Sequence, residues 1–338
     1  MRSKRLIKST LLYFLANASS RALTFLFLPV YSALLVPADY GEFDLITTAL
    51  IVIIPVVFIN IWMAVIRYML DSAVQDTDEV ISTSWILSFM SLAALVGLYL
   101  IISLFVPINY GPLALLLGIV QAYVNLYQFS VRGLKMQRVF AISGIFSTLV
   151  ALVLNIVFIV ILRWGIYALF WTSILSSLSL MMYCEYRARI LPRIQWSKFN
   201  RKLAMTMFKY ASPLILDNIA YWMLLMFNRF VLFAWFGADA NGYVAVANKF
   251  ITMLIMVNAI FYRTWQEETL LEMNSNDKQG YYSALFSRFI RIEISMVAVL
   301  IPFSFVLFSF MVNAAYSSSL ILIPLLLVSS ALNTTSDV

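Results

Sequence analysis

The chain contains no histidine and only one cysteine, Cys184, among its 338 residues. Histidine is the commonest general base and metal ligand, so its absence excludes most Ser-His, Cys-His and zinc mechanisms. A single cysteine excludes an intramolecular disulfide, and we interpret Cys184 as a small apolar filler at a helix end. A Gly-rich phosphate loop of the GxxxxGKS type is also absent, so we expect no ATP hydrolysis by the chain itself. The sequence therefore predicts a protein that is not an enzyme and uses no metal or other cofactor.

Charge is scarce as well. Charged residues make up 12% of the chain and hydrophobic residues 63%, and the mean hydropathy is +0.91. Ordinary globular domains are roughly half apolar and about a quarter charged, so a water-soluble core cannot hide this much apolar surface. A bilayer can, provided that every backbone polar group is satisfied within a helix or a closed barrel. Because the apolar runs are near-continuous rather than alternating, the sequence predicts an all-α polytopic membrane protein.

Apolar stretches of about 20 residues, the length that crosses a bilayer as a helix, recur about ten times along the chain. The expected spans are 10–36, 45–66, 84–106, 112–131, 139–162, 165–184, 208–236, 243–263, 288–312 and 316–333. We interpret residues 1–190 as an N-terminal lobe of about six helices and residues 191–338 as a partial C-terminal lobe of about four.

Basic residues are distributed unevenly between the two sides of these spans. Nearly all of the 23 Lys and Arg residues lie in the N-terminal segment and in the loops after even-numbered spans, above all in 185–209. The opposite loops contain only Arg163. This positive-inside pattern predicts a cytoplasmic N-terminus. The net charge of +7 then reflects topology and contact with anionic lipid rather than binding of nucleic acid.

A weak internal repeat relates the two predicted lobes. The segment PADYG at 37–41 lies between two long spans, and GADANG at 237–242 does the same in the second lobe. The same offset places Asn17 opposite Asp217. Same-sense repeats are a recurrent plan of secondary transporters, in which the substrate path lies between the halves. The repeat therefore predicts a two-lobed helix bundle whose second lobe is incomplete.

Polar side chains inside the apolar spans are the candidates for such a path. A charge at mid-bilayer costs ~2.5–3.5 kcal/mol on insertion scales, so it normally faces a cavity, a partner or water. Arg21 shares a helix face with Asn17, and Gln121, Asn125 and Gln128 share another, because each set has helical spacing. The predicted substrate-binding residues are Asn17, Arg21, Gln121, Asn125, Gln128, Asn218, Arg229 and Lys249.

Two interpretations of these polar stripes are open. The side chains either line a hydrated lumen that binds sugar hydroxyls and phosphate, or they pair across helix interfaces as packing contacts. The same alternatives apply to Ser143, Ser147, Thr148 and Asn155 on the fifth span. For the two arginines, the cost of burial favours the lumen. Asp217 is the candidate for ion coupling, and it either carries a coupling proton or neutralises a neighbouring arginine.

Several segments resemble bacterial polysaccharide-biosynthesis flippases. They are RALTFLFLPVY at 21–31, LVPADYGEFDL at 35–45 and RYMLD at 67–71, then YASPL at 210–214, NRF at 228–230, GA at 237–238 and GY at 242–243. The family is that of the Wzx-type O-antigen and capsule translocases, within the multidrug/oligosaccharidyl-lipid/polysaccharide exporter superfamily. The similarity runs over nearly the whole chain, and its most specific part is the PADYG segment with the Arg67-Tyr68 pair downstream.

The resemblance implies a MATE-like bundle of two lobes in the bacterial cytoplasmic (inner) membrane. Members of the family move an undecaprenyl-diphosphate-linked oligosaccharide to the outer leaflet by alternating access, with an ion gradient as the expected driving force. The resemblance implies a cationic central cavity that receives the diphosphate and sugars, and Arg21, Arg229 and Lys249 are the candidates for that part in this sequence. The implied partners are the bilayer, the lipid-linked oligosaccharide, a polysaccharide polymerase and a chain-length regulator. Because the family pattern continues beyond the position of Val338, the resemblance also predicts a C-terminal truncation.

Two other functions remain as alternatives. A multidrug or other small-molecule exporter of the same superfamily would prefer an acidic, aromatic cavity, whereas cations outnumber the single carboxylate Asp217 in the polar stripes. A membrane-embedded glycosyltransferase, acyltransferase or polymerase of the same pathway usually needs a large extramembrane loop or a reactive His or Asp cluster. The sequence contains neither.

Overall fold

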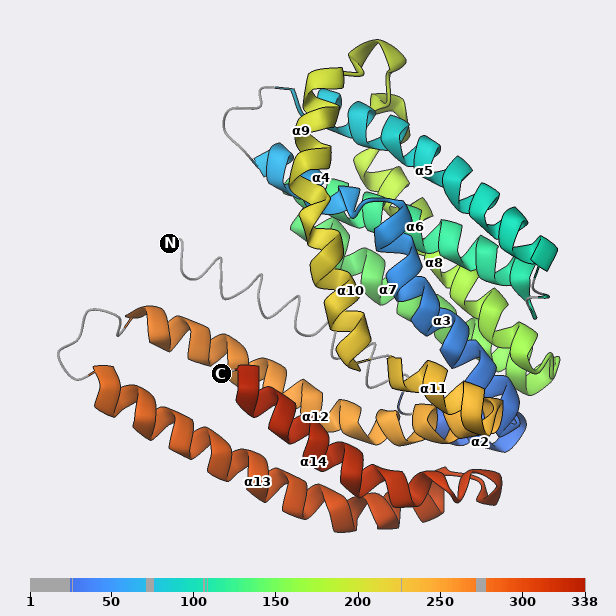
Figure 1. Ribbon diagram of the computed structural model, residues 1–338, viewed down its shortest axis with the longest axis vertical. Helices are drawn as coiled ribbons and strands as arrows, with labels where there is room; N and C mark the ends of the chain where they lie inside the picture. Colours follow the sequence, from blue (N-terminus) through green and yellow to red (C-terminus); the bar gives the residue numbers. More distant parts are fainter. Residues whose placement is uncertain are drawn as a thin grey trace. The chain divides into compact units, whose positions relative to one another are not determined.

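The computed structural model of the chain describes residues 25, 27–70, 76–105, 107, 109–225, 227–271 and 278–337, and every regular element within them is helical (Figure 1). In this described part, six helices are long and apolar enough to cross a membrane. They are α3 (Pro37–Val57), α5 (Thr77–Phe105), α6 (Gly111–Gly133), α7 with its π-helical continuation (Gln137–Ile161), α8 (Ile166–Ala188) and the Phe286–Met311 part of α13. The predicted all-α polytopic membrane protein is therefore confirmed.

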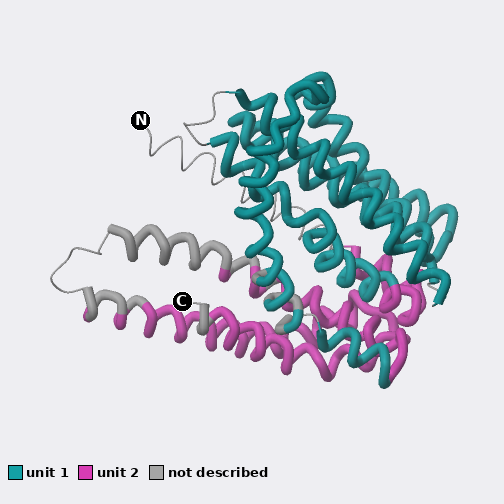
Figure 2. Tube along the Cα trace, turned by 45° about the horizontal axis from the view of Figure 1, so that its top comes forward, with its two compact units in different colours: residues 1–20, 43–235 teal, residues 21–42, 236–338 magenta. Residues whose placement is uncertain are grey.

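The described residues form two compact units, which Figure 2 colours separately. Unit 1 contains the described residues between 43 and 235, and unit 2 contains those between 25 and 42 together with those between 236 and 337. The boundaries fall inside α3 and at the end of α11 (Phe227–Phe236). The division into lobes 1–190 and 191–338 follows the internal repeat instead, and it stays a prediction.

Unit 1 is centred on α6, which packs against α4 (Ile61–Leu70) and α8, while α8 also packs against α7. Leu126 and Val131 of α6 and Phe170 of α8 are fully buried in its core, and so is Cys184, the predicted small filler. The predicted span 208–236 consists of three successive helices, namely α9 (Arg201–Ala211), α10 (Pro213–Leu225) and α11. Pro213 opens α10 because it lacks an amide N–H and so cannot continue the hydrogen bonding of the preceding helix.

The predicted span 45–66 is interrupted. Helix α3 begins at Pro37 and ends at Val57, and α4 begins only at Ile61. Ile59 and Asn60 have φ values of 53° and 49°, in the left-handed region that terminates helices. The Asn60 amide donates to the Pro55 carbonyl oxygen (2.8 Å) and the Ile59 amide to that of Val56 (3.2 Å), which are the bonds of a Schellman-type helix end. The prediction of one continuous helix was wrong because hydropathy carries no signal for a break between two apolar helices.

Unit 2 contains α2 (Leu28–Leu34), the first turns of α3, α12 (Ala238–Leu271), α13 (Lys278–Met311) and α14 (Ser319–Asp337). Helix α14 packs against both α12 and α13, as Figure 1 shows. The Ser32 hydroxyl donates to the Met311 carbonyl oxygen (3.1 Å) and accepts from the Asn313 amide (3.2 Å). The buried Tyr316 hydroxyl donates to the carbonyl oxygen of Leu35 (3.1 Å). These bonds tie α2 to the turn between α13 and α14.

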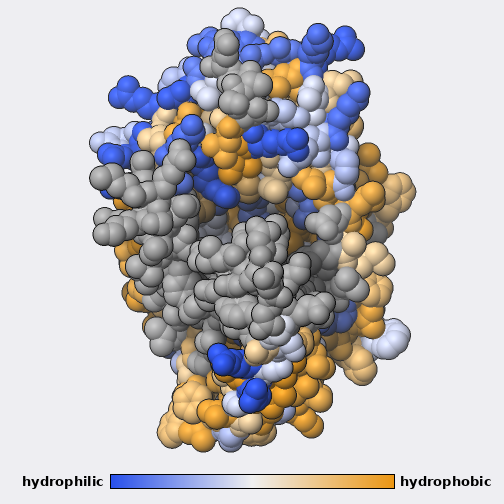
Figure 3. Space-filling model, turned by 90° about the vertical axis from the view of Figure 1, so that its left-hand side faces the viewer, coloured by the Kyte–Doolittle hydropathy of each residue, from blue (hydrophilic) through white to orange (hydrophobic). Residues whose placement is uncertain are grey.

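The described spans expose large apolar side chains that soluble proteins keep inside. Leu104 and Phe105 of α5 are each 81% exposed, and Phe310 of α13 is 83% exposed. Extended apolar surface of this kind marks contact with lipid or with another protein. On the face drawn in Figure 3, hydrophobic residues cover much of the described surface, whereas hydrophilic residues gather at the end of unit 1 that carries the start of α9. This distribution agrees with an apolar belt in the bilayer and a polar end outside it.

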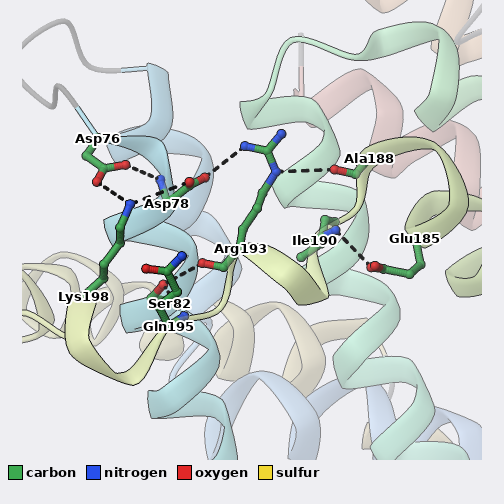
Figure 4. A network of polar contacts seen from close by, with 9 residues as sticks. All are labelled: Asp76, Asp78, Ser82, Glu185, Ala188, Ile190, Arg193, Gln195 and Lys198. Carbon is green, nitrogen blue, oxygen red and sulfur yellow. Dashed lines mark hydrogen bonds and ion pairs between the residues drawn. The ribbon is translucent and has the colours of Figure 1, made fainter.

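Residues 190–200, here called the connector, lie against the N-terminal end of α5 through a network of polar contacts (Figure 4). The Arg193 guanidinium pairs with Asp78 (2.9 Å) and the Lys198 ammonium with Asp76 (2.9 Å). Ser82 is fully buried, and its hydroxyl donates to the Arg193 carbonyl oxygen (3.0 Å) and accepts from the Gln195 amide (3.0 Å). The connector is therefore held against the start of α5 at several points along its length.

Two further groups hold the ends of the connector. The Glu185 carboxylate accepts from the amides of Ile190 (3.0 Å) and Leu191 (3.1 Å), and Asn200 caps α9 by accepting from the amides of Lys202 (2.8 Å) and Leu203 (3.1 Å). At the α5 end, the hydrogen bond from Lys198 holds the pKa of Asp76 below its usual value. The network therefore stabilises the connector with Asp76 ionised, and this contribution disappears as the pH falls through the lowered pKa.

Replacing Ser82 by alanine is expected to loosen the connector without unfolding unit 1. The change leaves the Gln195 amide and the Arg193 carbonyl without the hydroxyl that bonds both, and a lost hydrogen bond of this kind costs about 0.5–1.5 kcal/mol. Limited proteolysis within 190–200 and hydrogen exchange of the Gln195 amide should both become faster. Ser197→Ala is the matched control, because Ser197 is exposed on the same connector. Equal protection of the Gln195 amide in Ser82→Ala and the unmodified protein would contradict the assigned role.

Candidate functional site

Arg229, the predicted intramembrane cation of the seventh span, forms an ion pair with Asp44 within unit 1. The pair joins α11 to α3, and the two side chains are only 10% and 24% exposed. An arginine at lipid depth needs a partner or water, and a carboxylate supplies the stronger compensation. Arg229 is thus neutralised in the described structure, and a diphosphate would have to take the place of Asp44 in order to bind it.

Asp44 was not singled out in the sequence because the predicted span began only at residue 45. The structure begins α3 at Pro37, so Asp44 lies in the second turn of this helix and is partly buried. Asp39 lies in the first turn of the same helix. The sequence does contain a signal for this helix start, namely Pro37 and Asp39, because helices favour Pro at their first position and acidic residues in their first turn.

The amides Gln121, Asn125 and Gln128 lie along α6 and are all half-buried. None of the three forms a hydrogen bond with another described residue. Polar residues that hold helices together do so by bonding across the interface. For these three, the structure supplies no such partner among the described residues, so the choice between lumen and packing stays open and their substrate-binding role stays a prediction.

The remaining predicted residues have different surroundings. The Asn218 amide of α10 donates to the Leu214 carbonyl oxygen on its own helix (2.8 Å). Lys249 is half-buried on α12 and is partnered. Asp217 belongs to α10, but its side chain lies outside the described part, as do Asn17 and Arg21 altogether. The coupling role of Asp217 and the substrate-binding roles of all eight predicted residues stay predictions.

One hydroxyl of the fifth span bonds across a helix interface. Ser147 of α7 donates to the Ser176 carbonyl oxygen of α8 (2.8 Å), whereas Ser143 and Thr148 donate to carbonyls of their own helix. Asn155 is 7% exposed and precedes the π-helical stretch Ile156–Ile161. A hydroxyl that bridges two helices confirms the packing interpretation for Ser147.

Arg67, part of the segment that resembles the flippase family, stacks on aromatic rings. Its guanidinium carbon lies 4.2 Å from the ring centroid of Tyr210 and 6.0 Å from that of Tyr68. The Tyr68 hydroxyl reaches the Thr206 carbonyl oxygen at 3.5 Å. A cation over a ring face at this distance is attracted by the ring quadrupole. The contact joins α4 to α9 within unit 1.

The two repeated segments, 37–41 and 237–242, meet each other within unit 2. A Cβ atom on Gly41 would overlap the carbonyl oxygen of Ala238 and lie 2.5 Å from the amide nitrogen of Gly242. A Cβ atom on Gly242 would overlap the carbonyl oxygen of Pro37. Each glycine thus packs on the residue four positions before the other, so the contact is reciprocal. Only glycine lets two backbones approach so closely, which gives the weak sequence repeat a structural counterpart.

Buried carboxylates change the charge balance drawn from the sequence. Besides Asp44, Glu293 of α13 is only 2% exposed, and it lies inside the apolar part of that helix. The described spans therefore contain buried or partly buried carboxylates as well as Arg229 and Lys249. The sequence argument against a multidrug exporter, that cations outnumber carboxylates in the spans, is therefore wrong.

A groove with a volume of about 460 Å³ runs along α13 and is lined by Arg291, Ile292, Ser295, Met296, Val299 and Leu300. Its lining is almost wholly apolar, and none of the predicted substrate-binding residues belongs to it. The Ile292 and Val299 side chains are 53% and 65% exposed. This groove therefore belongs with the lipid-facing surface rather than with a polar substrate path.

Comparison with known proteins gives matches at the level of the fold. No family model and no curated protein matches the sequence. Among solved structures, the chain is similar to a multidrug resistance MATE family transporter of the MOP superfamily in an inward-facing conformation, with a TM-score of 0.67 and 17% identity over 93% of this chain and 79% of that one. It is also similar to a MATE in the straight conformation, with a TM-score of 0.60 and 16% identity over 97% of this chain and 80% of that one. A third similar structure is a MATE in the bent conformation, with a TM-score of 0.54 and 16% identity over 98% of this chain and 80% of that one. The chain is thus a multi-pass, all-α membrane protein with the fold of these MATE transporters.

Proposed function

We propose that the chain is a transporter of the bacterial inner membrane that moves an undecaprenyl-diphosphate-linked oligosaccharide to the outer leaflet by alternating access. The observation that carries this proposal is the likeness of its fold to MATE transporters over 93% of the chain. The substrate class comes from the flippase-like segments at 21–45 and 210–243. The positive-inside pattern of the sequence supports a cytoplasmic side for the N-terminus and the connector.

In this proposal, different polar residues bind the diphosphate and the sugars of the substrate. Arg21, Arg229 and Lys249 receive the diphosphate, since cations bind phosphate oxygens through charge-assisted hydrogen bonds. The half-buried amides of α6 bind sugar hydroxyls. Arg229 exchanges Asp44 for a phosphate when substrate enters, which couples substrate binding to the release of α11 from α3. In the transport cycle proposed here, the glycine contact between the two repeats forms when the outer side is closed and opens when substrate leaves.

A second candidate is export of small amphipathic molecules. One of the similar structures is described as a multidrug resistance transporter. The buried carboxylate Glu293 favours this candidate, because a cationic drug needs an acidic partner.

Deletion of the gene separates the two candidates. For the flippase, we expect loss of surface glycan and accumulation of lipid-linked oligosaccharide in the cytoplasmic leaflet, both reversed by the intact gene. Drug susceptibility of the deletion strain should stay unchanged. Increased susceptibility with normal surface glycan would support the exporter and overturn the flippase. A deletion that changes the sugar composition of the glycan rather than its surface amount would indicate an enzyme of the pathway.

A further inference from the structure

Three helices of unit 2 meet at a buried polar cluster that the transport proposal does not use. Asn258 of α12 donates through its side-chain amide to Glu293 Oε1 of α13 (2.8 Å) and to Thr334 Oγ1 of α14 (2.9 Å). Glu293 is 2% exposed and Asn258 6% exposed. The Thr334 hydroxyl donates in turn to the Ser330 carbonyl oxygen (3.0 Å). The cluster thus links all three helices through one carboxyl group and one amide.

One oxygen of this carboxyl group has no partner among the described residues. Glu293 Oε2 is buried and forms no hydrogen bond with them, whereas Oε1 accepts the bond from Asn258. Holding the helices together requires only the bonded oxygen. The second oxygen, Oε2, takes no part in holding the helices together, and it is the atom that can bind a proton. Buried polar atoms without a partner are rare in folded proteins. Ionisable residues inside a span are expensive to bury and usually mark ion or substrate pathways.

None of the charged side chains that the structure describes around Glu293 neutralises it. On α13, Arg288 and Arg291 are exposed, and the Arg291 Nε donates to the Ser287 carbonyl oxygen. On α12, Lys249 lies nine positions before Asn258, which is roughly 13 Å along a helix axis. Between Ser319 and Thr334, α14 contains no ionisable residue. No ion pair with Glu293 occurs among the described side chains.

The surroundings of the carboxyl group on its own helix are apolar. One turn to either side on α13 lie Phe289, 1% exposed, and Val297, 8% exposed. On α12, Leu254 lies one turn before Asn258 and is fully buried. An ionised carboxylate without a cation is disfavoured in such surroundings, and a protonated one is favoured.

From this geometry we infer that Glu293 is a proton-binding site of unit 2, which carries a proton while buried between α12, α13 and α14 and releases it when these helices separate. The role of this site rests on the proposed transport function. In that function, Glu293 is the group through which a proton gradient drives transport. The step is a reversible proton transfer from water to Oε2 and back, with Asn258 holding the other oxygen in place. Separation of α13 from α12 admits water and stabilises the ionised form.

The test uses the purified full chain in lipid nanodiscs and proteoliposomes, without any substrate for its first part. Infrared difference spectra between mildly alkaline and mildly acid buffer should show a protonated carboxyl band that shifts in heavy water. Glu293→Gln should lose this band entirely. Asp239→Asn should keep it, because Asp239 is an exposed carboxylate of the same unit. Glu293→Asp and Asn258→Ala should retain the band at a shifted frequency.

The second part measures transport driven by an imposed pH gradient. Glu293→Gln should lose the stimulation by the gradient completely, while substrate binding measured without a gradient should stay within twofold of the unmodified protein. A protonated carboxyl band that is present in both Glu293→Gln and the unmodified protein would overturn the assignment. Removal of the band by Na⁺ at constant pH would also overturn it, because that result would indicate a site for a metal cation. If the band behaves as expected but no lipid-linked oligosaccharide moves, the proton site stands and the proposed function fails.

Discussion

Replacing Gly41 by alanine is expected to abolish most of the surface glycan while the protein still inserts into the membrane. A Cβ atom at this position would overlap the Ala238 carbonyl oxygen, and because that atom belongs to a helix backbone it cannot move aside alone. The starts of α3 and α12 must therefore separate. Overpacking of this kind costs about 1–3 kcal/mol, which corresponds to a loss of the closed contact by about 5- to 150-fold. Gly242→Ala should behave in the same way, because it meets Pro37 reciprocally.

The structural part of this expectation can be measured by thiol labelling. With Cys184 replaced by serine, Asp39→Cys adds a reporter beside the contact, and a membrane-impermeant maleimide should label it faster when Gly41 is alanine. Gly97→Ala and Gly144→Ala are the matched controls, since a Cβ atom at either position has no neighbour within 4 Å. Both controls should keep full surface glycan, because alanine favours a helix more than glycine does. Unchanged labelling and full surface glycan in Gly41→Ala would show that the contact does not have to stay closed.

Replacing Asp44 by alanine is expected to destabilise the protein strongly. The change leaves the Arg229 guanidinium, whose side chain is 10% exposed, without its carboxylate. Breaking a buried ion pair by removing one partner costs about 3–5 kcal/mol, because the remaining charge is uncompensated. The midpoint of thermal unfolding in nanodiscs should fall accordingly, and membrane abundance should fall with it.

The double variant Asp44→Ala with Arg229→Met distinguishes a structural pair from a substrate-binding arginine. Removing both charges should restore most of the stability, since an apolar pair of similar volume replaces a buried ion pair at little cost. If Arg229 also receives the diphosphate, the double variant should be stable but inactive in surface glycan display. A stable and fully active double variant would assign Arg229 to packing alone. Equal unfolding midpoints for Asp44→Ala and the unmodified protein would show that the pair is solvated.

The candidate site illustrates where reasoning from sequence succeeds and where it stops. Arg229 was found because an arginine in an apolar run is conspicuous by itself. Its partner Asp44 was missed because the helix start was placed eight residues too late, and Glu293 was missed because the glutamate stands beside Arg291 in a segment interpreted as a helix end. The pairing of Asn258 with Glu293 has no local signal at all, since neither residue indicates which turn of another helix it faces.

The sequence alone determined that this chain crosses a membrane as helices, where most spans lie and which loops are basic. Insertion of a span depends on the summed hydropathy of its residues, and its orientation depends on the number of basic residues in the flanking loops. Neither quantity depends on which residues pack against each other. Only the tertiary structure decided that α3 ends at Val57, that Asp44 neutralises Arg229, and that the two glycine-containing repeats touch. Each of these depends on the rotation and register of helices distant in sequence, which packing of specific side chains fixes and average hydropathy does not.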